Sequence, residues 1–478
     1  MTASSEVHAA AYVGTGWLAR GPIRQVDDPS GGPTVGSIVT VDSADVDHAA
    51  AVAEDAGRSW RAVPPAERAV VLAAAGNVLQ GRSVEIADVL RCEGGRPRRE
   101  AEAEVAKAVK TFRYYAGLVG ALDGRSFAGS GGVRHETRRE PVGVAAAITP
   151  WNVPAASPAR KLAPALLAGN AVLLKPASAT PLTAWHLVRA LYDAGLPQGL
   201  VQFLPGAGST VGEAVATNRR VGAVSFTGST EVGLALQTSL SGTLTKLQLE
   251  LGGKNGAIVM PDADLDRATQ LIVQAAFAAA GQQCTATSRV IVHAAVADAV
   301  TDLIVERAEA LTVSDTADEA TQMGPLIDER QLSTTDGYVR RAVEAGAVIA
   351  TGGHRLDRPG SYYAPTVLTR VDRSSEIAMR EVFGPVLSIM VARDVDDAID
   401  VLNGTAYGLS SAVHTRDIRI AQRVAERADC GVVAVGGATA GIELAAPFGG
   451  FKSSGTTSKE HGPESMEFFT RTKLISWY

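Results

Sequence analysis

The chain contains few of the residues that build metal centres, disulfide frameworks or nucleic-acid interfaces. Cysteine occurs at only three widely separated positions, Cys92, Cys284 and Cys430, and such an odd set does not form a disulfide framework. The eight histidines stand singly, without the spacing of a ligand set, so no metal is expected. Basic residues form no long run and the net charge is −6, which argues against a nucleic-acid partner.

Long apolar runs are also missing. Every apolar stretch is interrupted well before the roughly 20 residues that a membrane span requires, so no membrane partner is expected. The opening sequence MTASSEVHAAAYVGTGWLARG lacks a charged head followed by an apolar core, and no signal peptide is predicted. Together with the unpaired cysteines, this favours a reducing, cytoplasmic location.

The chain has the length and the apolar content for two or three domains, with 478 residues of which 46% are hydrophobic. Amphipathic patterns predict helices over 44–62, 65–80 and 97–117. From residue 142 onward, short apolar runs alternate with Ala- and Leu-rich stretches, which is typical of βαβ units and a parallel sheet. The predicted strands cover 143–149, 170–176, 200–206, 223–228, 256–260, 288–293, 347–353, 386–392 and 431–437.

Two segments depart from this rhythm. Residues 122–141 alternate charged and small residues after a Gly/Ser turn, which predicts an exposed strand or hairpin. The C-terminal EFFTRTKLISWY is apolar and β-like, and at a chain end such a strand is usually covered by another subunit or domain.

Two glycine-rich turns follow predicted strands, the place where α/β proteins bind ligands. PGAGSTVG, with Gly208 and Gly212, misses the dinucleotide fingerprint by one residue and is weak evidence. In FTGSTEVG an apolar strand runs into Gly228 and Ser229, and the N–H groups of the following helix could receive a phosphate. An ordinary serine N-cap explains this second turn equally well.

Several polar side chains stand at other strand ends or in apolar surroundings. Lys175 is either solvated or binds a ribose hydroxyl or phosphate, and Trp151 either packs or lines a site. The amide of Asn152 can donate to a developing oxyanion. Glu250, between leucines, has the surroundings that raise a carboxyl pKa toward that of a general base, although pairing with a basic residue is an alternative. Cys284 in GQQCTATSRV is either a buried hydrophobe or a nucleophile.

Seven motifs occur in one order: ITPWNVP, LLKPAS, FTGSTEVG, LELGGKN, GQQC, EVFGP and PFGGFKSSG. In this order and at these intervals they resemble the aldehyde dehydrogenase superfamily, from about residue 44 to the C-terminal strand. The resemblance implies an α/β aldehyde dehydrogenase fold with three parts. A Rossmann-like NAD(P)-binding domain would span 1–121 and 142–252, an α/β catalytic domain 253–453, and a small β oligomerisation extension 122–141 and 464–478. A homodimer or homotetramer is implied.

The resemblance also implies the chemistry. Cys284 is the expected nucleophile, and its thiohemiacetal oxyanion would be bound by Asn152 and by the backbone N–H of Cys284. Loss of hydride to the nicotinamide leaves a thioester, which water activated by Glu250 hydrolyses to a carboxylic acid. Cys92 and Cys430 are expected to be small buried hydrophobes.

For the cofactor, the resemblance assigns the adenosine ribose to Lys175, the pyrophosphate to Ser229 and the nicotinamide ribose to Glu381. Ser178 stands where members restricted to NAD often have glutamate, so we expect NADP to be accepted, with NAD as the other cofactor. The other expected cofactor residues are Ile148, Trp151, Gly208, Gly212, Gly228 and Phe383.

Arg160 lies in the stretch that lines the substrate tunnel in this family, and an arginine there resembles the succinic semialdehyde dehydrogenases. GQQCTATSRV and SKEHGPESMEFFTRTK also resemble the branch that oxidises α-ketoglutaric semialdehyde. A buried guanidinium requires an anionic partner, so we expect a small anionic aldehyde, with Val153 and Phe448 as further substrate residues. The alternative is a salt bridge from Arg160 to a protein acid, with a hydrophobic or aromatic aldehyde as substrate.

The motif residues also distinguish between types of reaction. Relatives that transfer the acyl group to coenzyme A or phosphate lack the general-base glutamate, and a silent relative or a nucleotide-binding regulator would not need the cysteine and glutamate. Glu250, Cys284 and Asn152 are all present, which favours oxidation. Glu460 is either a second acid that relays protons from Glu250 or an exposed glutamate at a helix start.

Overall fold

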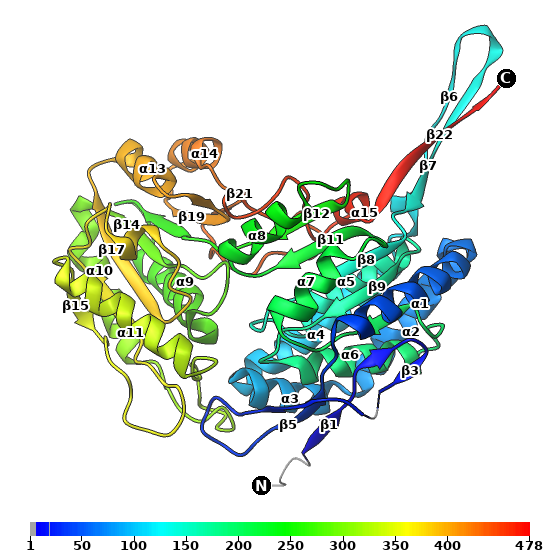
Figure 1. Ribbon diagram of the computed structural model, residues 1–478. Coiled ribbons are helices and arrows are strands. Elements are labelled where there is room, and N and C mark those ends of the chain that lie inside the picture. The colour runs from blue at the N-terminus through cyan, green and yellow to red at the C-terminus, as the bar shows by residue number, and fades with distance from the viewer. Residues whose placement is uncertain (1–5, 19) are drawn as a thin grey trace.

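The computed structural model describes residues 6–18 and 20–478. Figure 1 shows two α/β bodies side by side and a narrow sheet that projects from one of them and carries the C-terminus. Residues 1–5 and 19 lie outside the described residues. They belong to the predicted first domain and to the N-terminal stretch in which no signal peptide is predicted.

The first body is built on a seven-stranded sheet in the order β12-β11-β8-β9-β10-β2-β3. The strands from β12 to β10 are parallel, and β2 and β3 are added antiparallel. Three of the parallel strands, β8, β9 and β10, are buried throughout, which is the pattern of a sheet covered on both faces. The bounds are β2 (Tyr12–Val13), β3 (Gly16–Trp17), β8 (Val144–Ile148), β9 (Ala171–Lys175), β10 (Val201–Phe203), β11 (Val221–Thr227) and β12 (Lys246–Glu250).

Helices enclose this sheet. Three of them, α1 (Ser43–Ala62), α2 (Pro65–Gly81) and α4 (Arg98–Ala116), confirm the predicted helices. Asp42 and Asp45 start α1 with a reciprocal capping box. α3 (Ser83–Gly94) was missing from the prediction: only Arg82 separates it from α2, and Gly81, the last residue of α2, is the one local sign of the break. The others are α5 (Ala156–Leu167), α6 (Pro181–Asp193), α7 (Glu213–Thr217) and α8 (Thr230–Leu240).

The second body has its own seven-stranded sheet, in the order β15-β16-β17-β14-β13-β19-β20, parallel except for β15. Its strands are β13 (Gly256–Val259), β14 (Arg289–His293), β15 (Val348–Thr351), β16 (Thr366–Thr369), β17 (Val386–Ala392), β19 (Ser410–His414) and β20 (Val432–Val435). Its helices are α9 (Leu265–Phe277), α10 (Ala297–Glu309), α11 (Glu329–Glu344), α12 (Glu376–Met379), α13 (Val395–Asn403) and α14 (Ile418–Arg427).

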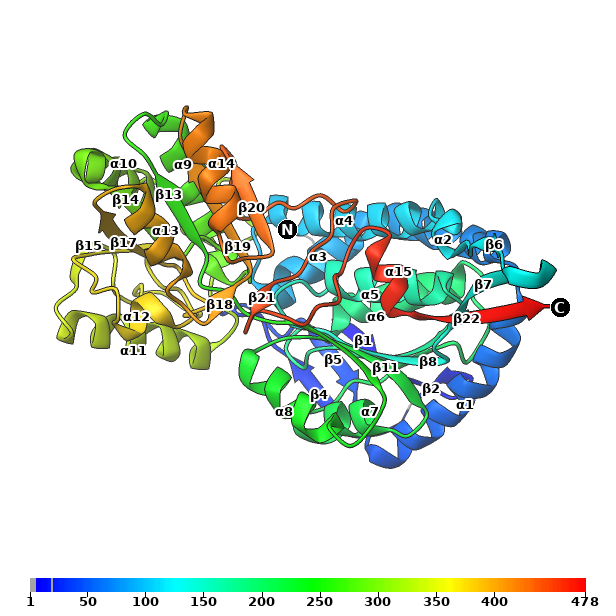
Figure 2. The ribbon, with the colours of Figure 1, turned by 90° about the horizontal axis from the view of Figure 1, so that it is seen from above.

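The projecting sheet consists of β6 (Ser126–Ala128), β7 (Arg134–Pro141) and β22 (Thr470–Trp477). β22 pairs antiparallel with β7 over its whole length, and both views show the sheet standing away from the two bodies (Figures 1 and 2). The predicted exposed hairpin and β-like tail are therefore confirmed as secondary structure.

Shorter elements complete the chain: β1 (Val7–Ala9), β4 (Ile23–Val26), β5 (Gly36–Val39), β18 (Tyr407–Gly408), β21 (Phe451–Lys452) and α15 (Glu464–Phe468). Buried apolar residues form two clusters: one contains residues up to Leu251 together with four from the C-terminal part of the chain, and the other runs from Ala257 to Val424. Leu444 belongs to the first cluster although it lies inside the range predicted for the catalytic domain, so the chain after β20 returns to the first body. The domain limits stay a prediction. Within residues 6–18 and 20–478, no helix is both long and apolar enough to cross a membrane.

Candidate active site

A cavity of about 490 Å³ lies where the two bodies meet. Its volume is within the range of roughly 300–1,000 Å³ that is typical of ligand sites. The predicted site residues that line it are Trp151, Asn152, Val153, Arg160, Gly228, Ser229, Glu250, Cys284, Glu381, Phe383 and Phe448. The other five do not line it: Ile148, Lys175, Ser178, Gly208 and Gly212.

Cys284 follows a turn with an unusual backbone. Ala279, Ala280 and Gly281 have φ angles of 55°, 54° and 70°, in the left-handed region. Each non-glycine residue in this conformation costs about 1–3 kcal/mol and persists only where its surroundings hold it. A Cβ at Gly281 would lie 2.2 Å from the carbonyl oxygen of Gly384, so only glycine fits there. The apolar run before Cys284 gave no sign of this turn in the sequence.

Asn152 faces the same loop. Its Nδ2 donates to the carbonyl oxygen of Gln282 at 2.8 Å, and Asn152 and Cys284 line the cavity together. Burial raises the pKa of the Cys284 thiol to about 12, although the positive charge of Arg160 acts in the opposite direction. The thiol is therefore protonated at neutral pH and requires a proton acceptor before it can attack a carbonyl.

Glu250 ends β12 and is 3% exposed. Neither of its carboxylate oxygens has a hydrogen-bond partner among the residues that the structure describes. Burial raises its pKa well above the usual value, and the charge of Glu460 raises it further, while Lys161, Lys459 and Arg160 act in the opposite direction. A carboxylate with a raised pKa is suited to accept a proton near neutral pH. The alternative of a glutamate paired with a base is not what the structure shows.

Glu460 lies beside Glu250, buried rather than exposed, and at a β-bridge with Phe448 rather than at a helix start. Its carboxylate accepts a hydrogen bond from Lys161 Nζ, which also donates to Ser225 Oγ at 2.7 Å. Burial raises the pKa of Glu460, but the charges of Lys161 and Arg160 and the Lys161 hydrogen bond outweigh it and lower the pKa. The alternative of an exposed glutamate is therefore wrong, because backbone pairing with Phe448 and the contact with Lys161 hold Glu460 inside the protein.

Arg160 has no carboxylate within hydrogen-bond distance in the described part of the chain. Its Nε donates to the carbonyl oxygen of Ala156, and its Nη1 lies 3.1 Å from His461 Nε2. The nearest carboxylate oxygen, on Glu460, is 4.0 Å away. Burial lowers the pKa of His461 to about 3, so the ring is neutral and can accept from Arg160. The guanidinium lies over the Phe448 ring, 5.9 Å from its centroid.

Lys107 is a second cation on the cavity wall, and it was not among the predicted site residues. Its Nζ makes no hydrogen bond or ion pair with any residue in 6–18 and 20–478. The residue as a whole is exposed, but partial desolvation at the cavity wall lowers its pKa, and the charge of Arg160 lowers it further. Glu100, Glu104 and Lys107 line the cavity from one face of α4 at helical spacing, and that spacing could have indicated them.

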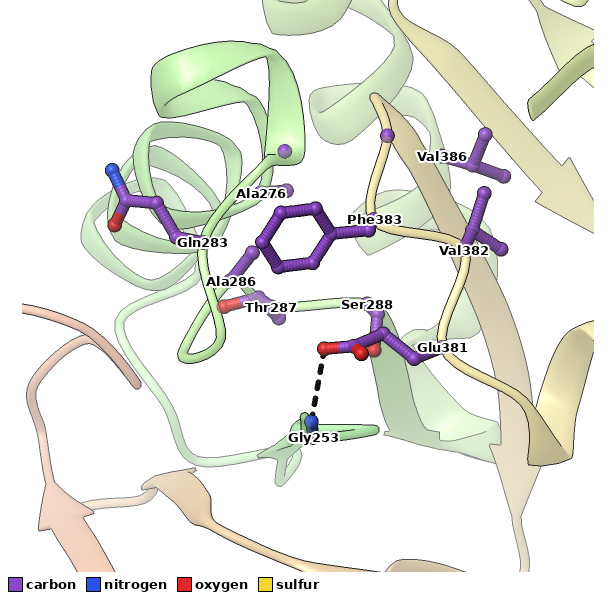
Figure 3. A pocket seen from close by; sticks show the side chains of 12 residues that line it. Gly253, Ala276, Gln283, Ala286, Thr287, Ser288, Glu381, Val382, Phe383 and Val386 are labelled. Carbon is purple, nitrogen blue, oxygen red and sulfur yellow. Dashed lines mark hydrogen bonds between the residues drawn. The ribbon is translucent and has the colours of Figure 1, made fainter. Parts of the chain in front are cut away.

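Glu381 and Phe383 lie at the other end of the cavity, around a small side pocket (Figure 3). Glu381 Oε1 accepts from Gly253 N at 3.0 Å, and burial raises the pKa of this carboxyl to about 7. A Cβ at Gly252 would lie 2.1 Å from Glu381 Oε2, so glycine allows this close approach. The rings of Phe383 and Trp151 meet edge to face with centroids 5.3 Å apart.

The turn from β11 to α8 suits a phosphate. Ser229 is the N-cap of α8, with Oγ accepting from Val232 N at 3.4 Å, so the ordinary capping role is observed. The hydroxyls of Thr227 and Thr230 are buried without a partner in the described chain. A Cβ at Gly228 would lie 2.5 Å from the Phe226 ring, so only glycine fits and no side chain covers the backbone at this position of the turn. Free hydroxyls beside a bare turn and a helix N-terminus fit a dinucleotide.

The remaining cofactor residues lie on the first body. Lys175 ends β9 next to Gly212, and Gly208 and Gly212 bound a short π-helical turn. Burial lowers the pKa of Lys175 to about 8, and the charge of Arg24 lowers it further. Arg24, also missed in the sequence, donates from Nε to the carbonyl oxygen of Ser178 at 3.1 Å. Ser178 Oγ donates to Gly206 O at 3.0 Å, and Ile148 ends β8.

The other two cysteines are half-buried rather than buried. Cys92 packs against the first apolar cluster. Cys430 is not a simple hydrophobe, because its Sγ lies 3.0 Å from Ser411 Oγ and donates to Val432 O at 3.2 Å. Burial raises the pKa of both thiols, and neither lines the cavity.

Two tandem α/β bodies, a strand-to-helix turn that suits a phosphate, and a cysteine and a buried carboxylate on the wall of one cavity are the features of a nucleotide-dependent enzyme. Residues 18–475 match the model of the aldehyde dehydrogenase family. An α-ketoglutarate semialdehyde dehydrogenase of Haloferax volcanii is 41% identical over 91% of this chain and 90% of its own. A benzaldehyde dehydrogenase of Pseudomonas putida is 37% identical over 96% of this chain and 94% of its own. A crystal structure of betaine aldehyde dehydrogenase from Staphylococcus aureus in complex with NAD+ superposes with a TM-score of 0.95 at 31% identity, covering 98% and 94% of the chains.

The chain therefore belongs to the aldehyde dehydrogenase family. It is an enzyme that oxidises aldehydes with NAD or NADP. The predicted family and fold are confirmed.

Proposed function

We propose that this enzyme oxidises a small anionic aldehyde of the dicarboxylic semialdehyde type, through a covalent intermediate on Cys284. The observation that carries the proposal is the composition of one cavity. Cys284, Asn152 and Glu250 face it together with Arg160, a cation with no carboxylate in hydrogen-bond reach among the described residues.

In this mechanism Cys284 Sγ forms a bond to the aldehyde carbon as its proton passes to Glu250. The resulting oxyanion accepts hydrogen bonds from Asn152 Nδ2 and from the backbone N–H of Cys284. The nicotinamide cofactor supplies the acceptor for the hydride that leaves this carbon. Glu250 then takes a proton from the water that attacks the thioester, and the carboxylic acid departs as the thiol is restored.

Glu250 must lose its proton between these steps. Glu460 and Lys161 lie behind it, and Glu460 stays ionised because of Lys161 and Arg160. In the proposed mechanism the charge of Glu460 holds the Glu250 pKa high, and the pair passes protons away from the cavity.

We further propose that the enzyme accepts NADP, with NAD as the other cofactor. Lys175, Ser178 and Ser229 would hold the cofactor, with Glu381, Trp151 and Phe383 at its nicotinamide end. Position 178 carries no acid that would repel a 2′-phosphate, and Arg24 and Lys175 place two cations beside it. A kcat/KM for NAD that exceeded the value for NADP by about 100-fold would contradict this proposal.

The experiment for the substrate class compares aldehydes on the wild type and Arg160→Ala. Succinic semialdehyde, α-ketoglutaric semialdehyde and phosphonoacetaldehyde represent the anionic class, and hexanal and benzaldehyde the neutral class. The variant should lower kcat/KM for the anionic class about 10-fold more than for the neutral class. Lys107→Gln should act in the same direction, with Lys110→Gln as its control, since Lys110 pairs with Glu443 outside the cavity.

The second candidate is a hydrophobic or aromatic aldehyde. It is favoured by the similarity to a benzaldehyde dehydrogenase and by Val153 and Phe448 on the cavity wall. Preference for hexanal or benzaldehyde, with unchanged rates in Arg160→Ala, would select this candidate over the first.

We also propose that the protein is a cytoplasmic homo-oligomer joined through the projecting sheet. Phe127, Leu474 and Trp477 expose large apolar side chains on that sheet, and its edge strand is open for pairing. Deletion of 470–478 should reduce the mass measured by light scattering, and an unchanged mass would contradict the proposal.

A further inference from the structure

The left-handed turn at Ala279–Gly281 is held by a carboxylate from a distant part of the chain. Both oxygens of Glu100 accept from the backbone N–H of Ala279, at 3.1 Å each. Glu100 lies in the first turn of α4, and 179 residues separate it from Ala279. The turn leads directly into Gln282 and Cys284.

The same carboxylate is linked to the loop of Asn152. Arg96, just before α4 and 5% exposed, donates from Nη1 to Glu100 Oε2 at 3.1 Å. Its Nη2 donates to the carbonyl oxygen of Asn152. One ion pair therefore contacts the backbone on both sides of the cavity, beside Asn152 and before Cys284.

A third contact closes the ring. Asn152 Nδ2 donates to the carbonyl oxygen of Gln282, and Gln282 Nε2 donates to the carbonyl oxygen of Ala279 at 3.0 Å. The path runs from Ala279 through Glu100, Arg96, Asn152 and Gln282 back to Ala279. It joins the two backbone segments through hydrogen bonds, and three of its links involve a charged side chain and are the stronger kind.

We propose that Arg96 and Glu100 are positioning residues that fix Asn152 and the turn before Cys284 relative to each other. The inference rests on the proposed roles of Asn152 and Cys284. Neither Arg96 nor Glu100 needs to touch the reacting atoms. They contribute by holding the Asn152 amide at a fixed position relative to the N–H and thiol of Cys284, although the turn before Cys284 is strained.

A purely structural role is the competing explanation, since Glu100 also lies at the positive end of the α4 dipole. That role would lower stability, with no selective effect on kcat. Two controls on the same stretch separate the roles. Arg99 and Glu102 are exposed on α4 and make no hydrogen bond or ion pair with the described residues.

The first measurement is hydrogen exchange, which needs no aldehyde. Glu100→Ala and Arg96→Met should speed exchange in peptides covering 276–284, whereas Arg99→Met and Glu102→Ala should not. Unchanged exchange in both test variants overturns the proposed clamp. Glu100→Gln keeps an acceptor oxygen of the same shape and should give partial rescue, and it remains testable if the alanine variant fails to fold.

The second measurement is steady-state kinetics. Glu100→Ala should lower kcat on the order of 10- to 100-fold with little change in KM, because the substrate still binds but the reacting groups are misplaced. In an Asn152→Ala background the same change should cost less than about threefold, since the group being positioned is gone. The proposal is overturned if the fold-losses in kcat from Glu100→Ala and Asn152→Ala multiply fully in the double variant, or if Glu100→Ala raises only KM.

These results are separable from failure of the proposed function. Retained aldehyde oxidation in Cys284→Ala would refute the covalent mechanism. The exchange measurement would still decide whether Arg96 and Glu100 hold the turn.

Discussion

Two buried carboxylates in this protein have opposite surroundings. Glu250, in the cavity, has no hydrogen-bond partner in the described chain, and its pKa is raised. Asp397, near the start of α13, accepts from Arg373 at 2.7 and 2.8 Å and from the backbone N–H of Arg393 at 2.9 Å. The hydrogen bond from Arg373 is the main cause of its lowered pKa. The comparison separates a carboxylate that is left free for chemistry from one that holds the fold together.

The largest expected effect lies in the cavity. Cys284→Ala removes the proposed nucleophile, and we expect kcat to fall on the order of 10⁴-fold or more. The folded structure should remain, because the side chain makes no hydrogen bond among residues 6–18 and 20–478. The check is aldehyde-dependent formation of reduced cofactor, with Cys430→Ala as the control. Activity that survives in Cys284→Ala would remove the basis for placing the chemistry in this cavity.

Glu250→Gln tests the free carboxylate itself. The amide cannot take a proton from water, so we expect turnover to fall about 10²- to 10⁴-fold. Because Glu250 accepts a proton in both steps of the proposed mechanism, formation and hydrolysis of the thioester should both slow, so single-turnover formation of reduced cofactor should fall together with steady-state turnover. The unfolding free energy should be equal or higher, because a buried charge without partners is replaced by a neutral group. A clear loss of stability with normal turnover would show that Glu250 stabilises the fold, as Asp397 does, and is not the base.

Part of this contrast was readable in the sequence. Glu250 stands between leucines at the end of an apolar strand, and its burial and raised pKa were predicted. β8, β9 and β11 were predicted because each is a short apolar run that ends at a glycine- or proline-rich turn. Cys284 and Asn152 were identified from motifs of consecutive residues.

What the sequence concealed depends on contacts across long separations. Glu460 is buried because Lys161, 299 residues away, is its partner. The alanines at 279 and 280 follow a helix and look helical themselves, and the left-handed turn arises from Glu100 and Gly384. Lys107 and Arg24 can be recognised as candidate site residues only when the residues that surround them in the fold are known. Local pattern predicts elements and motifs, whereas the pairing of charges requires the fold.

Asp397→Asn tests the satisfied carboxylate. The loss of the paired hydrogen bonds with Arg373 should lower the unfolding free energy by about 1–3 kcal/mol, with kcat unchanged. Asp400→Asn on the same helix is the control, since its side chain is 77% exposed, and its effect should stay within about 0.5 kcal/mol. Because the folded pKa of Asp397 is depressed, its contribution is present above the unfolded pKa and is lost as the pH falls through the folded pKa. Denaturant unfolding at neutral and acidic pH checks both statements.

Glu460→Gln gives the smallest effect and the sharpest test of the free carboxylate. Its negative charge raises the pKa of Glu250, whereas Lys161 lowers it. The substitution removes the negative charge that raises the Glu250 pKa and leaves the charge of Lys161 without its partner, so both effects lower the Glu250 pKa. A general base works when it is ionised, so activity is lost as the pH falls through its pKa, and the acid limb of the kcat profile should move to lower pH. Because pKa and basicity fall together, the plateau rate at high pH should also decrease. A limb that stays in place would show that Glu250 titrates independently of Glu460, and the acid limb would then have to come from another group.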